Sequence, residues 1–167
     1  AIYFIGVIIV LGAYWREIPG AFETVFGFAF SLKAAVGGVI GISVQRAISL
    51  GVSRGVLSNE AGLGSAAIAQ SASRSSDPTD NGLLAMTGVF IDTIVVNTLT
   101  TLLIVVTGVW KLTPVMGGGL TSTALTASAM STVIPSGSLI IAFCSFLFGY
   151  TTLIGWCYYG EICWEYI

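Results

Sequence analysis

The chain of 167 residues contains no histidine and very little charge. Lys and Arg total 6, Asp and Glu total 8, and charged residues make up 8% of the sequence, whereas soluble domains average about 25%. The formal net charge of −2 provides no basic field for nucleic acid. Without histidine, the residues present cannot form a Ser-His catalytic pair. We therefore expect no nucleic-acid partner and no enzymatic activity.

Metal and cofactor chemistry also has little support in the sequence. Three cysteines, Cys144, Cys157 and Cys163, lie in or beside one apolar run, and no metal-ligand spacing relates them. We expect them to be reduced and to pack as small apolar residues. No bound cofactor is expected.

What the sequence has in abundance is apolar residues, which make up 55% of the total. A membrane-spanning helix needs roughly 17 to 25 predominantly apolar residues, and three runs reach that length: 34–52, 82–110 and 138–160. Residues 1–15 open within an apolar run, with neither an initiator Met nor a charged flank, and are interpreted as the last part of a fourth span. A signal peptide would need a basic start and a small-residue cleavage site, and neither is visible in this stretch. We predict an all-α, multi-pass membrane protein, and expect the chain to be an internal piece of it.

Breakers and caps delimit the connections between the spans. Asp77 is a suitable N-cap and Pro78 suits the first helical position, so a helix is predicted to begin there. Arg54 and Arg74 favour the cytoplasmic side for the connection 53–81. Apolar residues at helical spacing after Pro19 predict a short interfacial helix. Glycines and Pro135 break the apolar pattern and predict a long connection before the last span.

Small residues recur along two of the predicted spans and indicate faces that contact other helices. In the second span they are Ala34, Gly38, Gly41 and, in register, Gln45. In the last span they are Ser138, Ala142, Ser145, Gly149 and Thr152. Helix packing alone explains most of these residues.

Three features go beyond helix packing. Gly37 and Gly38, with Gly41 close by, predict a break that exposes backbone groups to a ligand, because each glycine costs a helix about 1 kcal/mol. Asp92 lies well inside the third span, where a carboxylate is costly unless it is paired or hydrated. Thr151 and Thr152 are adjacent hydroxyls in an apolar helix, although such hydroxyls also bond to their own helix.

Three motifs resemble the alanine or glycine:cation symporter family, the sodium:alanine symporters of bacteria and archaea. They are GVSRGVLSNEAGLGSAAIAQSA at 51–72, AMTGVFIDT at 85–93 and GWCYYGE at 155–161. The resemblance implies the fold of the bacterial leucine transporter, with two inverted five-helix repeats and discontinuous first and sixth helices. The chain would then hold the end of helix five and helices six, seven and eight.

The resemblance also implies site residues. Gly37, Gly38 and Gly41 would offer backbone groups to the substrate at the break in helix six, with Phe30 and Gln45 as neighbouring pocket residues. The sodium-binding half on helix eight would be FGYTT, with hydroxyls from Thr151 and Thr152 and a carbonyl from Phe148 or Gly149. Asp92 would be a buried polar hub. The connection after helix six would include a short helix of small residues. Arg54, Asn59 and Glu60 in this connection are expected to take part in gating.

The expected function is sodium-coupled symport of a small neutral amino acid, alanine or glycine, by alternating access. Its partners would be the amino acid, sodium as a co-transported ion and membrane lipid, in the cell membrane of a bacterium or archaeon. Two alternatives stay open: a proton-coupled or other small-amino-acid transporter of the same superfamily, and a channel or structural membrane subunit.

Overall fold

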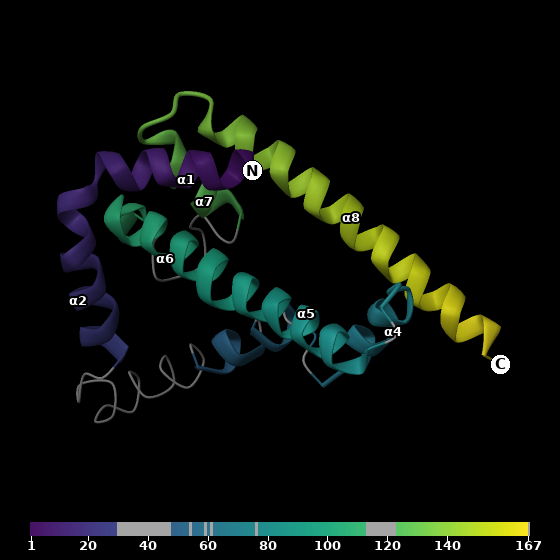
Figure 1. The fold of residues 1–167 in the computed structure, drawn as a ribbon. Coiled ribbons are helices and arrows are strands. Elements are labelled where there is room, and N and C mark those ends of the chain that lie inside the picture. Colours follow the sequence, from purple (N-terminus) through teal and green to yellow (C-terminus); the bar gives the residue numbers. More distant parts are fainter. Residues whose placement is uncertain are drawn as a thin grey trace. The chain divides into compact units, whose positions relative to one another are not determined.

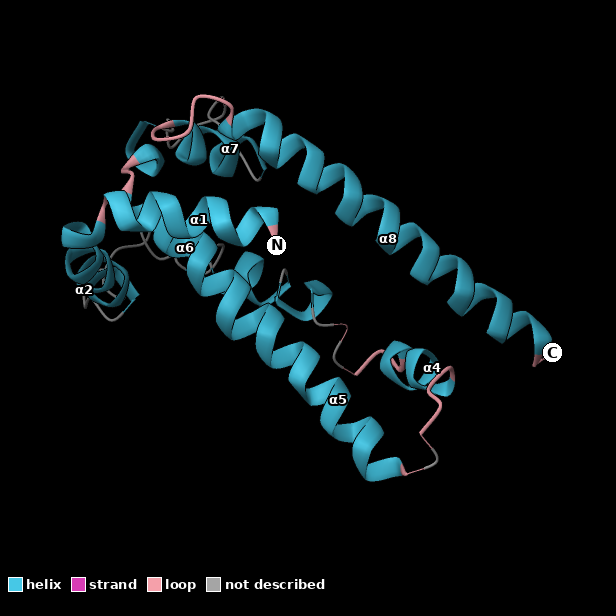
Figure 2. Cartoon of the chain, turned by 45° about the horizontal axis from the view of Figure 1, so that its top comes forward, coloured by secondary structure: helices cyan, strands magenta, loops and turns pink. Residues whose placement is uncertain are grey.

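The structure, a computed structural model, describes residues 1–29, 48–53, 55–58, 60, 62–75, 77–112 and 123–166. Within these ranges every regular element is a helix, and Figure 2 shows no strand among them. The chain separates into two compact units, Ala1–Ser31 with Thr98–Gly149, and Leu32–Asn97 with Tyr150–Ile167. The described part of the chain is therefore all-α, as the apolar runs predicted.

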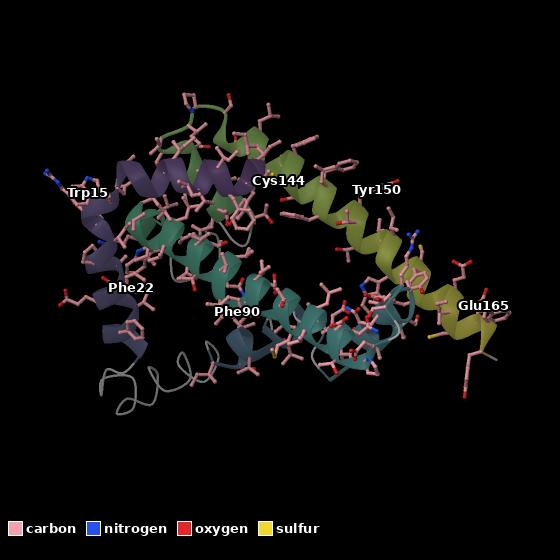
Figure 3. The ribbon with its side chains drawn as sticks, in the orientation of Figure 1. Trp15, Phe22, Phe90, Cys144, Tyr150 and Glu165 are labelled. Carbon is pink, nitrogen blue, oxygen red and sulfur yellow. The ribbon has the colours of Figure 1, made fainter. Side chains whose placement is uncertain are left out.

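The first unit begins with two helices that meet at a sharp bend (Figure 1). Helix α1, Ile2–Ala13, is followed by the 3-10 turn η1, Trp15–Glu17, and by α2, Ile18–Ala29. The bend between the two helical segments is 77°, and Trp15 lies at it (Figure 3). By length and composition the pair qualifies together as one broken span or a re-entrant loop.

A long helix runs over Pro78–Val106 and is apolar enough to cross a membrane. It consists of α5, Pro78–Phe90, the π-helix η3, Ile91–Val96, and α6, Asn97–Val106. The predicted N-cap is confirmed, because the Asp77 carboxylate accepts a hydrogen bond of 2.8 Å from the Thr79 amide. The π-helical turn has no counterpart in the sequence-based prediction of this segment.

The second long helix is α8, Gly137–Glu165, which also qualifies as a membrane span. The face of α8 that is buried within the described chain carries Gly137, Ile141 and Cys144. The predicted stripe of small residues lies on an exposed face, so its contact with other helices stays a prediction. All three cysteines are free thiols, and Cys144, labelled in Figure 3, is the buried one.

The core of the first unit is built from α1, α6, the 3-10 turn η4 (Val109–Leu112) and α7 (Thr123–Ser131). Its largest fully buried side chains are Leu103, Met130, Val7 and Val10. The Tyr3 hydroxyl forms a hydrogen bond with the Thr100 hydroxyl and so joins α1 to α6. Helix α7 lies within the predicted long connection, and burial of Ala129 and Met130 stabilises it.

Candidate functional site

A pocket of about 980 Å³ lies within the second unit. Its walls are Glu60, Gly62 and Gly64, the short helix α4 (Ser65–Ser71), the second half of α5, and α8 from Thr151 to Tyr159. Small residues line much of it: Gly62, Gly64, Ala66, Ala67, Ala69, Ala85, Gly88 and Gly155. A hydrogen bond of 3.3 Å between the hydroxyls of Ser71 and Tyr158 links α4 to α8 beside the pocket. The predicted short helix of small residues is therefore present, as α4.

The residues just before the N-terminus of α4 have an unusual backbone conformation. Glu60 has a φ of 52°, and both Gly62 and Gly64 have a φ of 84°. Glycine adopts this left-handed region readily, whereas glutamate does so at a cost of about 1–3 kcal/mol that the surrounding structure must offset. Backbone bonds hold Glu60 there: its amide donates to the Val56 carbonyl at 2.9 Å, and its carbonyl accepts from Leu63 at 3.1 Å. Glu60, Gly62 and Gly64 therefore give the backbone a left-handed conformation just before α4.

Ser65 is a buried polar residue that sequence analysis missed. It is 8% exposed and lines the pocket. Its hydroxyl has no hydrogen-bond partner among the residues that the structure describes. Because an unsatisfied buried polar group costs about 1–3 kcal/mol, a polar atom bound in the pocket would gain from pairing with this hydroxyl. The available signal in the sequence was the position of Ser65 directly after the Gly-Leu-Gly stretch 62–64.

Asp92 lies in the first turn of the π-helix η3. Its Oδ2 accepts a hydrogen bond of 2.5 Å from the hydroxyl of Ser58, which belongs to the helical residues 55–58. π-Helical turns within α-helices are rare and occur often at functional sites. The segment before the left-handed loop is thus tied to the middle of the long helix through a carboxylate, and Ser58 also lines the pocket.

The hydroxyl pair Thr151 and Thr152 lines the same pocket as Glu60. Both threonines already take part in interactions within the chain. Gly149 and Phe148 occupy the preceding turn of α8 and are not among the described lining residues. The structure therefore brings together Glu60, Thr151 and Thr152, with Asp92 joined to this pocket through Ser58.

Several predicted site residues lie outside the described residues. These are Phe30, Gly37, Gly38, Gly41, Gln45, Arg54 and Asn59. The predicted break in the second span belongs to this group, and the described end of that span, residues 48–53, is helical. Within the described residues no cluster of three or more Cys, Asp or Glu side chains could hold a metal ion.

Helices of this length and apolar composition define a helical membrane protein. All of residues 1–167 match the model of the sodium:alanine symporter family. The chain belongs to that family.

Curated relatives share between about one third and two fifths of their aligned residues with the chain. A sodium/alanine symporter of Methanococcus maripaludis is 42% identical over 165 residues, 99% of this chain and 35% of the relative. An uncharacterized transporter of Haemophilus influenzae is 42% identical over 152 residues, 91% of this chain and 33% of its own length. A probable sodium/glutamine symporter of Bacillus subtilis is 36% identical over 163 residues, 96% of this chain and 32% of the relative. The chain thus spans about a third of the length of these relatives.

Proposed function

We propose that the protein to which this chain belongs is a sodium-coupled symporter of small neutral amino acids, alanine or glycine, that works by alternating access. The observation that carries the proposal is the family match over residues 1–167, together with 42% identity to a relative named as a sodium/alanine symporter. The proposed fold is that of the bacterial leucine transporter, with this chain supplying helices six to eight and the end of helix five. In such folds, unwound backbone and helix ends hold substrate and ion near the membrane midplane.

The proposed sodium ligands on α8 are the hydroxyls of Thr151 and Thr152 with a carbonyl of Phe148 or Gly149. Neutral oxygens replace the water around a monovalent ion without the charge density that favours a divalent one. The position of both threonines in a pocket with Glu60 and the unsatisfied Ser65 hydroxyl supports this assignment. Sodium bound there would stabilise the arrangement of α8 against the loop 60–64, which we assign to the gate with Arg54 and Asn59.

The substrate would bind at the proposed break near Gly37, Gly38 and Gly41, with Phe30 and Gln45 beside it. Glycines allow a substrate to approach the backbone closely because they carry no Cβ. Substrate binding would complete the occlusion that sodium prepares. The downhill movement of sodium would then drive the uphill movement of the amino acid, without covalent chemistry.

Uptake into proteoliposomes tests the proposed function directly. The intact protein should accumulate radiolabelled alanine in a saturable manner when sodium is higher outside, and should not do so with potassium in its place. Preloaded alanine should exchange with external label.

Uptake driven by a pH gradient without sodium would support the proton-coupled alternative. Ion conductance without saturable uptake or exchange would support a channel. Competition by glycine and by glutamine would rank the substrates, since one relative is named for glutamine.

Replacing Thr151 or Thr152 by Ala should raise the sodium concentration for half-maximal uptake. We take the loss of one oxygen that coordinates the ion to be comparable to the loss of a hydrogen bond to a charged group, about 1.5–3 kcal/mol, so we expect a rise of roughly tenfold or more. Alanine affinity at saturating sodium should change less. Thr87 is a matched control, because its hydroxyl bonds to the Leu83 carbonyl within α5 and does not line the pocket. Unchanged sodium dependence in both variants would place the ion elsewhere.

A further inference from the structure

A second, smaller pocket of about 250 Å³ lies entirely within the first unit. It is formed by the start of α2 and by the end of α6 with the turn that follows, and its described lining includes Glu17, Thr24, Thr107 and Lys111. Drug-sized ligands occupy sites of roughly 300–1,000 Å³, so this pocket suits a smaller molecule. It shares no residue with the pocket of the second unit.

Hydrogen-bond acceptors make up one part of the lining. The Thr24 hydroxyl donates its proton to the Gly20 carbonyl at 2.7 Å, and the Thr107 hydroxyl donates to the Leu103 carbonyl at 2.8 Å. A hydroxyl has one proton and two lone pairs. Both oxygens can therefore only accept from a ligand, as can the carboxylate of Glu17. A group with several N–H donors and a positive charge matches this set.

Lys111 supplies the opposite charge in the same pocket. Its ammonium lies 5.6 Å from the centre of the Trp110 ring, within the range of a cation–π contact. Both Glu17 and Lys111 are exposed, and among the described residues no ion pair joins them. Apolar Ala21 and Val106, which are 3% and 9% exposed, also line the pocket. Two residues of opposite charge thus line one small cavity, and among the described residues they form no ion pair with each other.

We propose that this pocket is a second binding site for a zwitterionic α-amino acid. The ligand's ammonium group pairs with Glu17 and the hydroxyl oxygens of Thr24 and Thr107, and its carboxylate pairs with Lys111. A ligand with only one of the two charges leaves either the acid or the base of the pocket without a partner. The site goes beyond the proposed transport site and depends on none of its residues.

Two measurements on the intact protein in lipid nanodiscs test this site. The first is the number of radiolabelled alanine molecules bound per protein, which should approach two in the wild type. It should approach one, over the concentrations that saturate the wild type, in Lys111→Gln and Glu17→Gln, since each lost charge should weaken this site at least tenfold. Lys111→Arg, which keeps the charge, and Glu23→Gln, an exposed acid on α2 outside the pocket, should retain two.

The second measurement needs no variant. Alanine should slow acylation of the Lys111 amine, followed by peptide mass spectrometry, with or without sodium, whereas propionate and alaninamide should protect at least tenfold less well. Equal numbers of alanine molecules bound to the wild type and to both charge-deleted variants, or acylation of Lys111 at an unchanged rate, would each overturn the proposal. Protection of Lys111 is measured without transport. It can therefore be observed even if sodium-driven uptake fails, and uptake can be observed even if alanine does not protect Lys111.

Discussion

Replacing Asp92 by Asn is expected to lower the rate of alanine uptake by tenfold or more, while the amount of protein in the membrane stays close to that of the wild type. A carboxylate inside a span costs about 2.5–3.5 kcal/mol on insertion scales unless partners compensate for it. Asp92 has one such partner in the Ser58 hydroxyl. A hydrogen bond to a charged group contributes about 1.5–3 kcal/mol, and each 1.4 kcal/mol corresponds to a factor of ten. Asn keeps the shape and one acceptor oxygen, removes the charge, and replaces the second oxygen by an NH2 donor.

Ser58→Ala separates the two roles of this pair. It keeps the charge of Asp92 and removes the bond between residues 55–58 and the π-helix, so a smaller loss of about three- to tenfold is expected. Asp80→Asn is the control, because Asp80 lies in the exposed first turn of α5. Wild-type uptake in Asp92→Asn would contradict a role in transport. Rapid modification of Asp92 by a lipid-soluble carbodiimide would contradict its orientation away from lipid.

Among the glycines that the structure describes, Gly137 should cause the largest loss of stability when it is replaced by Ala. A Cβ at Gly137 would lie 2.6 Å from both the Met130 carbonyl carbon and the Ser131 nitrogen, and 2.8 Å from the Met130 oxygen. These are backbone atoms, so the clash cannot be relieved by rotating a side chain. Overpacking typically costs about 1–3 kcal/mol, and we expect the upper end of that range. Thermal unfolding in detergent, read by size-exclusion chromatography, should show a clearly lower midpoint.

Gly160→Ala is the matched control on the same helix. No atom lies within 4 Å of a Cβ built there. Alanine is favoured over glycine in a helix interior by about 1 kcal/mol, so this variant should be as stable as the wild type or slightly more stable. Equal midpoints for Gly137→Ala and the wild type would show that α7 and the start of α8 do not approach each other as closely as described.

Local sequence signals predicted those parts of the fold that depend on neighbouring residues. Asp77 before Pro78 is a helix start that needs no distant partner, and the cap it predicts is present. The left-handed loop is also a local feature, because Gly62 and Gly64 adopt positive φ readily, but it was not predicted from the sequence. By contrast, α7 depends on tertiary burial of Ala129 and Met130, which a Thr- and Ser-rich segment does not reveal.

The candidate site was harder to predict because its pairs are distant in sequence. Asp92 stood out by its cost in an apolar span, but Ser58, its partner 34 residues away, carried no signal of its own. The π-helical turn changes the hydrogen-bonding register without any glycine or proline to mark it. Thr151 and Thr152 were recognisable as adjacent hydroxyls, whereas their position in one pocket with Glu60 and Ser65 required the fold.

The two long helices have a consequence for the thickness of the bilayer they suit. Each has 29 residues and is therefore about 44 Å long, whereas the hydrocarbon layer measures about 30 Å. The surplus is polar at the start of α5, with Pro78, Thr79, Asp80 and Asn81, and at the end of α8, with Glu161, Trp164 and Glu165. These residues can reach into the headgroup region, so a bilayer several ångströms thicker is accommodated by submerging one more turn and a thinner one by tilting. Such helices tolerate changes in acyl-chain length that would strain a span of minimal length.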